Sequence, residues 1–413
     1  MSVAGPSKTR TDFMGAADER RRSMQAAFTD LLASVGLTGA RPAEVGRSLG
    51  LDKTLAWKVS RLVHSSDPVE TFRHMPGPAG IEIVLRAAGE KLVQDDVLGR
   101  VRRAYQELQA FVDQHAGDRR TFEAMLAGNT PDPGGEFDER RAYFRSGSAM
   151  WGVRAKVQFL MLALKPSESR PGHIDVAQVG GLVNLERLRA DVPWIVRRLR
   201  AHTDTGGSLL PAQRVPLVAE RAEKGLPPLF DRYCSEPLPE LRQFKGSDGW
   251  VYDELAPGSV GRAGATTVVL GERYVGALPL DRSEDNTRGV YLLTVRTPVE
   301  CVLFDLLLHR DLAHFGRPTR GVYGLLEGRP AVPPNSQSGE RPSTLMAPAP
   351  ATELGSSAVV HTHRMPSYPA MVESALELAG FGGLESFRGY RAEIEYPAFP
   401  CDVRLALEIA ARV

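Results

Sequence analysis

The stretch Arg41–Val63, RPAEVGRSLGLDKTLAWKVSRLV, carries the clearest local structural signals in this chain. It predicts a first helix over Pro42–Leu49, because the fixed φ of proline suits the first position of a helix. Gly50 can take the left-handed conformation that ends a helix, and Asp52 can cap the helix that follows. A second helix is therefore predicted over Lys53–Val63. The packed side of this helix pair would consist of Val45, Leu49, Leu51, Ala56, Val59 and Leu62.

The outer side of the second helix would present polar, aromatic and basic side chains, namely Lys53, Thr54, Trp57, Lys58 and Arg61. A helix of this kind, placed after another helix and a tight turn, is the arrangement that enters the major groove of DNA. The segment resembles the helix-turn-helix of bacterial transcriptional regulators, whose small, glycine and apolar positions are matched here by Gly46, Gly50, Leu51, Ala56 and Val59. The resemblance covers only a short part of the chain.

The resemblance implies a DNA-binding surface made of six side chains. Thr54, Trp57, Lys58 and Arg61 would approach bases or phosphates, whereas Arg47 and Lys53 would mainly contact phosphates. The bulk of Trp57 allows it to pack on a neighbouring helix instead. Two other interpretations of the segment stay open: an ordinary helical hairpin in a core, and a helix-turn-helix that binds protein.

Composition places any nucleic-acid affinity in a local patch. The chain has 413 residues, enough for two or three domains, and its formal net charge is only +1. Such a patch exists where Arg47, Lys53, Lys58 and Arg61 follow one another with few acids between them. The run Arg20-Arg21-Arg22 could add phosphate contacts, although a solvated helix face is the favoured interpretation.

Cysteine usage and hydropathy favour a cytoplasmic protein. The three cysteines, Cys234, Cys301 and Cys401, lie far apart without a CxxC spacing, which argues against a disulfide framework and a zinc finger. Met1–Asp12 is too polar for a signal peptide. The apolar clusters Val157–Leu164 and Cys301–Leu308 are too short to span a bilayer, so no membrane partner is expected.

The patterns along the chain predict an α+β protein. We expect a flexible tail over 1–17, a helical helix-turn-helix domain over 18–91, a helical middle region over 92–202, a linker or surface-wrapping segment over 203–249, and a mixed α/β-rich domain over 250–413 with a flexible proline-rich loop near 327–354.

Two features of the N-terminal half leave alternatives open. Ile81–Leu85 could be a strand of a β-wing, but Gly80–Ala88 fits a helix equally well. Leu92–His115 is predicted to be a long amphipathic helix. It would either pair two copies of the chain or pack inside one.

The C-terminal region shows short β-branched segments and one clear helix. Strands are predicted over Thr266–Leu270, Val275–Leu278, Val290–Arg296, Val299–Phe304, Ser357–His361 and Tyr390–Tyr396. The helix is predicted over Tyr368–Ala379 and would end at Gly380.

The sequence motifs identify no catalytic residue and indicate no cofactor. His309-Arg310-Asp311-Leu312 matches the start of a kinase catalytic loop, but its companion motifs are missing. The glycine-spaced loop Ser259–Ala265 precedes a strand instead of following one, which indicates a turn. His361 and His363 are the candidates for a metal site, because alternate residues of a strand share a face, but further ligands are not identified.

The first hypothesis is therefore a DNA-binding transcriptional regulator, acting on double-stranded DNA as a homo-oligomer, most simply a homodimer. Its C-terminal domain would sense a small-molecule effector or assemble the oligomer. The alternatives are an enzyme with a site in the C-terminal domain, which could be metal-dependent, and a structural assembly protein whose helix-turn-helix binds protein.

Overall fold

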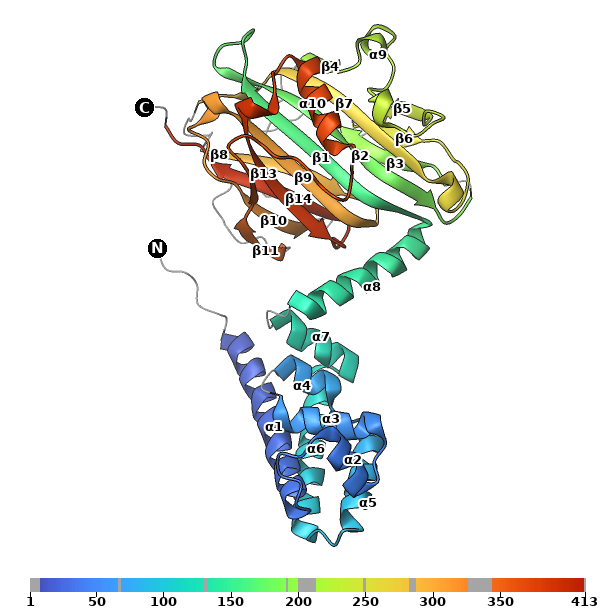
Figure 1. The fold of residues 1–413 in the computed structure, drawn as a ribbon, viewed down its shortest axis with the longest axis vertical. Helices are drawn as coiled ribbons and strands as arrows, with labels where there is room; N and C mark the ends of the chain where they lie inside the picture. Colours follow the sequence, from blue (N-terminus) through green and yellow to red (C-terminus); the bar gives the residue numbers. More distant parts are fainter. Residues whose placement is uncertain are drawn as a thin grey trace. The chain divides into compact units, whose positions relative to one another are not determined.

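The computed structural model describes residues 8–65, 68–129, 133–190, 192–199, 213–247, 250–281, 287–325 and 344–411. Helices and strands are both abundant in these ranges, so the expected α+β class is confirmed. The chain divides into two compact units, Met1–Glu136 and Phe137–Val413, which are coloured along the sequence in Figure 1.

The described residues of the first unit form helices joined by turns and short irregular segments. Its helices are α1 (Lys8–Ser34), α2 (Pro42–Leu49), α3 (Lys53–His64), α4 (Pro68–His74), α5 (Pro78–Gly89), α6 (Asp95–His115) and α7 (Arg119–Asn129). The long helices α1 and α6 pack along each other, and α3 packs on α1 (Figure 1). Because α1 begins at Lys8, residues 8–17 are helical and not a flexible tail, and Ala17 is already buried.

The two open questions about this unit are answered by α5 and α6. Residues 78–89 form a helix, so the possible wing strand at Ile81–Leu85 is absent there. The apolar stripe of α6, including Val101, Leu108 and Phe111, is buried in the core of the unit together with residues of α1 such as Phe28. This stripe therefore packs inside one chain, which was the second of the two alternatives.

The second unit is built on a mixed seven-stranded sheet with the order β12-β13-β9-β1-β2-β7-β4. Its strands are β1 (Val153–Pro166), β2 (His173–Arg187), β4 (Gln213–Pro216), β7 (Thr266–Pro279), β9 (Val299–His309), β12 (Thr352–Gly355) and β13 (Phe387–Glu395). Strands β1 and β9 are parallel, and the other neighbours in this sheet are antiparallel.

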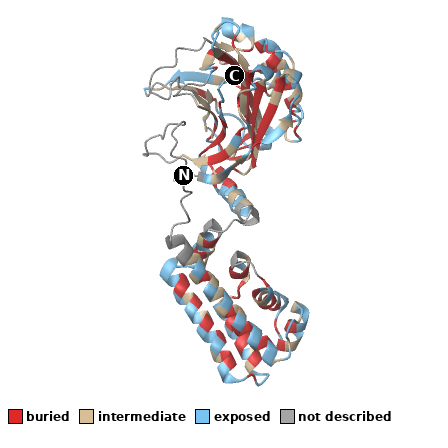
Figure 2. Ribbon diagram, turned by 90° about the vertical axis from the view of Figure 1, so that its left-hand side faces the viewer, coloured by how far each residue is buried: buried red, intermediate tan, exposed pale blue. Residues whose placement is uncertain are grey.

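Both faces of this sheet are covered. Leu160, Leu162 and Leu164 of β1 point into a core shared with a four-stranded sheet of β8 (Arg288–Val295), β10 (Thr319–Gly324), β11 (Thr344–Pro350) and β14 (Cys401–Glu408). Phe159 and Met161 point to the other face, which is covered by α10 (Tyr368–Ala379). Buried strands therefore run through the middle of the unit in Figure 2.

Smaller elements complete the second unit. A three-stranded sheet is formed by β3 (Trp194–Leu199), β5 (Leu241–Lys245) and β6 (Val251–Leu255). The remaining helices of the second unit are α8 (Pro133–Trp151) and α9 (Ala219–Glu223). From Phe137 onward α8 packs on the segment between β13 and β14, where the Tyr143 hydroxyl donates to the Phe399 carbonyl at 2.7 Å.

The structure corrects several predicted elements. The second half of the helical middle region is wrong, because β1, β2 and β3 occupy most of residues 153–199. In the predicted linker, the described part 213–247 contributes β4 and β5 to the sheets. In the predicted flexible loop, residues 344–354 contain β11 and the start of β12, and 327–343 lie outside the described residues. Ser357–His361 forms turns and irregular backbone in place of a strand.

Candidate nucleic-acid interface

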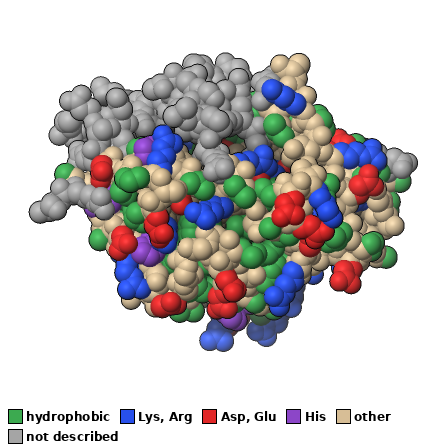
Figure 3. All heavy atoms as spheres, turned by 90° about the horizontal axis from the view of Figure 1, so that it is seen from above, with side chains coloured by type: hydrophobic (Ala, Val, Ile, Leu, Met, Phe, Trp, Pro, Cys, Tyr) green, Lys and Arg blue, Asp and Glu red, His purple; other side chains and the backbone are tan. Residues whose placement is uncertain are grey.

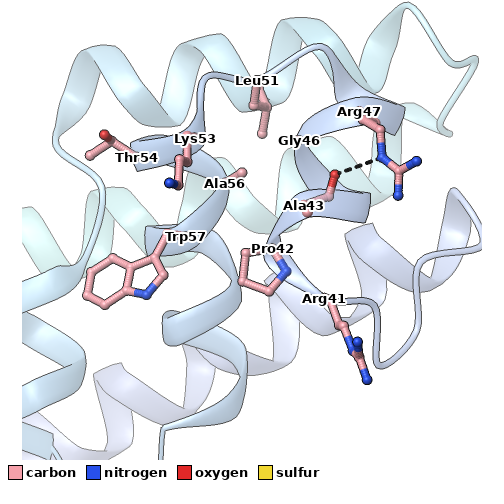
Figure 4. Close-up of a pocket in the computed structure, with 10 residues that line it drawn as sticks. All are labelled: Arg41, Pro42, Ala43, Gly46, Arg47, Leu51, Lys53, Thr54, Ala56 and Trp57. Carbon is pink, nitrogen blue, oxygen red and sulfur yellow. Dashed lines mark hydrogen bonds between the residues drawn. The ribbon is translucent and has the colours of Figure 1, made fainter.

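An open hollow of about 820 Å³ lies between α2 and the start of α3 (Figure 4). Its apolar lining consists of Pro42, Ala43, Gly46, Leu51, Ala56 and Trp57. Its polar lining consists of Arg41, Arg47, Lys53 and Thr54. The hollow therefore combines the surface of both helices with the turn that joins them.

Glycines at two positions allow this close arrangement. A Cβ atom on Gly46 would lie 3.3 Å from the Ala56 Cβ and 3.3 Å from the Leu51 carbonyl oxygen, which is tighter than most side-chain contacts. Gly50 has φ 63°, in the left-handed region, and its N–H donates to the Gly46 carbonyl. Most other residues would be strained at Gly50 by about 1–2 kcal/mol. The sequence signals for a turn at this place are thus met by its backbone geometry.

Asp52 fixes the direction in which α3 begins. Its carboxylate accepts the backbone N–H groups of Thr54 at 2.8 Å and Leu55 at 3.0 Å, which satisfies donors that the first turn of a helix leaves without partners. Leu55 and Ala56 are then buried, whereas Lys53 and Thr54 stay exposed. The polar N-terminal turn of α3 consequently faces solvent.

The ionisable side chains that line the hollow are all cationic: Arg41, Arg47 and Lys53. The Arg47 Nε donates to the Ala43 carbonyl at 3.3 Å, which holds the guanidinium beside α2 (Figure 4). The adjacent acids act in helix capping, since Glu44 accepts the Arg41 N–H at 2.8 Å and Asp52 caps α3. The hollow therefore offers a positively charged edge to an anion.

The structure brings four of the six predicted site residues together at the hollow, namely Arg47, Lys53, Thr54 and Trp57. Lys58 and Arg61 lie outside its lining. Arg61 forms an ion pair with Glu70 of α4, and its guanidinium carbon lies 5.7 Å from the centre of the Trp57 ring. Arg61 is thus held against its own unit by a partner on another helix.

Trp57 packs against a neighbouring helix, the alternative that its bulk allowed, and it also lines the hollow. Its side chain lines the hollow and is 38% exposed, yet its ring also meets the edge of His74 with the ring centres 4.8 Å apart. Burial lowers the pKa of His74, opposed by Glu70 and reinforced by the cations Arg73, Arg61 and Lys58.

Six lining residues were not among the predicted site residues, namely Arg41, Pro42, Ala43, Gly46, Leu51 and Ala56. Arg41 precedes Pro42, and a residue just before a proline at the first helical position borders the helix start. That signal could have placed Arg41 beside the N-terminus of α2. Of the upstream arginines, Arg22 is solvated as expected, with its side chain 70% exposed, whereas the Arg21 side chain is only 11% exposed; both pair with Asp18 within α1.

The structure places the histidine candidates for a metal in a loop. His361 and His363 are both exposed and outside any strand. Asp305 is fully buried and accepts two hydrogen bonds from Arg391, each of 2.8 Å. Across the described ranges, no group of three or more His, Cys, Asp or Glu side chains is placed to hold a metal ion.

The other motifs have local structural roles. The His309 ring pairs with Asp311 at 3.2 Å in a short turn, and Arg310 donates to the Ser386 hydroxyl at 2.8 Å. The glycine-spaced loop before β7 is a turn, as expected.

The cysteine thiols are poor nucleophiles. Burial raises the pKa of Cys234 to about 11, and it raises the pKa values of Cys301 and Cys401 to about 12. A thiol must be deprotonated to attack, so these side chains are unreactive at neutral pH.

A scan of the chain against protein-family models found no match, and neither did a search of curated proteins. In the described part of the chain, no helix is long and apolar enough to cross a membrane.

Proposed function

We propose that the first unit binds double-stranded DNA through α2 and α3, with α3 as the recognition helix of a helix-turn-helix. The observation that carries this proposal is the exposed N-terminal turn of α3, bordered by Arg41, Arg47 and Lys53 with no acid in the lining of the hollow. A recognition helix uses its N-terminal residues to contact base edges in the major groove. Cations beside it neutralise the flanking phosphates.

The contacts divide by reach and chemistry. Thr54 and Trp57 are the candidates for base edges, because a hydroxyl can bond either kind of base edge and an aromatic ring can meet a thymine methyl. Arg41, Arg47 and Lys53 would contact phosphates, which position the protein without specifying sequence. Arg61 acts as a positioning residue, since it holds Trp57 from one side while its charge is paired with Glu70.

The positive charge that would attract DNA is local. The net charge of the whole chain is only +1. On the face of the second unit seen in Figure 3, basic and acidic side chains are interspersed and do not gather by sign. Attraction to a polyanion therefore depends on patches such as the edge of the hollow.

The second unit would serve as the sensing or oligomerisation part of a cytoplasmic transcriptional regulator. Its sheet has its own closed core on both faces, so it can act as an independent module. A homodimer would present two copies of α3 to half-sites about one helical turn of DNA apart.

Selection from a random duplex pool tests the proposal. The wild-type chain should enrich a common sequence, and Thr54→Ala should enrich the same sequence with one base position relaxed, because removing one base contact costs about 1–3 kcal/mol of discrimination. Thr121→Ala on α7 is the control: it removes an exposed threonine hydroxyl that donates only to Asp118, at 2.7 Å, and should leave every base position unchanged. A pool without enrichment would contradict the proposal, and a fully retained preference in Thr54→Ala would remove this side chain from the interface.

A further inference from the structure

We propose that the hollow between α2 and α3 also binds a small amphipathic anion, a flat apolar body that carries one carboxylate or sulfonate group. The hollow offers such a ligand a space of matching size, apolar walls and cations at its edge. Binding of such a ligand does not require the proposed DNA binding, although its regulatory consequence does.

The volume of the hollow fits a small molecule better than it fits the apolar groups of DNA. The hollow measures about 820 Å³, within the range of about 300–1,000 Å³ that small-molecule sites occupy. The only apolar group that a base edge offers in the major groove is the methyl of thymine. A single methyl cannot fill an apolar space of this size, so contact with DNA accounts for the cations but leaves the hollow largely empty.

The walls suit a flat apolar group. Pro42 is the first residue of α2 and Trp57 lies in the second turn of α3, and both rings line the same space as Ala56 (Figure 4). The Trp57 ring already contacts Arg61 and His74 within its own unit. A wall that is fixed before binding lowers the entropic cost of binding.

The edge supplies the anion partner. Arg47 is held beside the hollow by its bond to the Ala43 carbonyl, and Arg41 lies at the start of the same helix. A guanidinium can donate two parallel hydrogen bonds to a carboxylate, which fixes orientation as well as adding affinity. The acids nearest in sequence, Glu44 and Asp52, are engaged in helix caps.

The site shares Arg47, Lys53 and Trp57 with the proposed DNA surface. A ligand in the hollow would therefore exclude DNA, because both would use the same cations and the same exposed face. The ligand would thus compete directly with operator DNA for this surface of the protein. This consequence rests on the proposed function.

Equilibrium dialysis of the full chain against 2-naphthoate, with 2-naphthamide as the neutral analogue, tests the binding site without DNA. We expect one saturable site per chain with a dissociation constant below about 1 mM for the carboxylate and weaker binding of the amide. Ala43→Leu, which fills the hollow from an exposed helix position, should weaken naphthoate binding at least about tenfold, and Arg47→Met should do the same by removing the anion partner.

Ala124→Leu on α7 is the matched control, since it adds the same side chain at another exposed helix position of the first unit. It should leave naphthoate binding unchanged. No saturable binding, equal binding of acid and amide, or wild-type affinity in both Ala43→Leu and Arg47→Met would overturn the proposal. The dialysis contains no DNA, so its result is independent of whether the proposed function is correct.

Discussion

Replacing Arg391 with leucine should lower the free energy of unfolding of the second unit by about 3–5 kcal/mol, the usual cost of leaving one member of a buried ion pair alone. Arg391 of β13 lies opposite Asp305 of β9 and donates two hydrogen bonds of 2.8 Å to its carboxylate. The same guanidinium donates to the carbonyls of Val360 and His361, and the Tyr368 hydroxyl donates to Asp305 at 3.0 Å. The change therefore strands a carboxylate that is fully buried.

The difference in free energy of unfolding between wild type and Arg391→Leu should become smaller as the pH is lowered. Burial raises the pKa of Asp305 above 3.8, and hydrogen bonds from Arg391 and Tyr368 oppose that rise. A raised pKa in the folded state means that folded Asp305 binds its proton more tightly than unfolded Asp305 does. The stabilisation from protonated Asp305 is therefore fully present below pH 3.8 and is lost as the pH rises through the folded-state pKa. Without Arg391 the pKa rises further, and the variant gains stability relative to wild type on acidification.

Hydrogen exchange of the β9 and β13 amides measures this stability within the second unit alone. The matched control is Arg317→Leu, which removes the exposed pair between the Arg317 Nε and Glu353 Oε1 at 3.1 Å. An exposed pair contributes at most about 1 kcal/mol. Equal losses in the two variants would show that the Asp305–Arg391 pair does not hold β9, β13 and α10 together.

The second large effect concerns DNA binding. Arg47→Ala/Lys53→Ala should weaken binding about tenfold or more, and it should make the slope of log K against log salt shallower by about 1.8, because about 0.9 of a counterion is released for each neutralised phosphate. The measurement is fluorescence anisotropy of a labelled duplex at several salt concentrations. Neither side chain is buried, so the fold should be retained.

Arg102→Ala/Arg103→Ala makes the same change of charge on exposed positions of α6 and serves as the control. It should leave the slope within error of wild type if α2 and α3 form the interface. A similar loss in both double variants would indicate general attraction to a polyanion and would contradict a defined surface at the hollow.

Local signals were sufficient for α2, α3 and α10. Pro42, Gly50 and Asp52 act within one turn of their own position, so their effect is visible in the sequence. Tyr368–Ala379 was predicted with the observed bounds, because Gly380 ends the helix in the left-handed conformation with φ 72°.

Strands buried on both faces were not predictable in the same way. Val157–Leu164 is a continuous apolar run, and such a run does not distinguish a strand from a buried helix. The side chains of β1 do alternate between the two faces of the sheet, since Leu160 lies in one core and Phe159 in the other, but both faces are apolar and the sequence therefore shows no alternation. In β2, Gly181 is required because a Cβ there would overlap the Val268 carbonyl of β7, a contact that no local pattern reveals.

The candidate site likewise combines residues that local sequence signals predict with contacts that depend on tertiary packing. Arg47, Lys53, Thr54 and Trp57 were found because helical spacing places them near the turn. The pairing of Arg61 with Glu70 and the contact of Trp57 with His74 depend on how α4 packs against α3. The hollow itself depends on the close packing of Gly46 on Ala56, so its volume is a tertiary property.

The most direct test of the central claim is the binding of the full-length protein to DNA from the neighbourhood of its own gene, measured at two salt concentrations with nonspecific competitor present. The account predicts a complex that survives the competitor and weakens at the higher salt concentration. Binding no tighter than to the competitor DNA would contradict the assignment of α3 as a DNA-recognition helix.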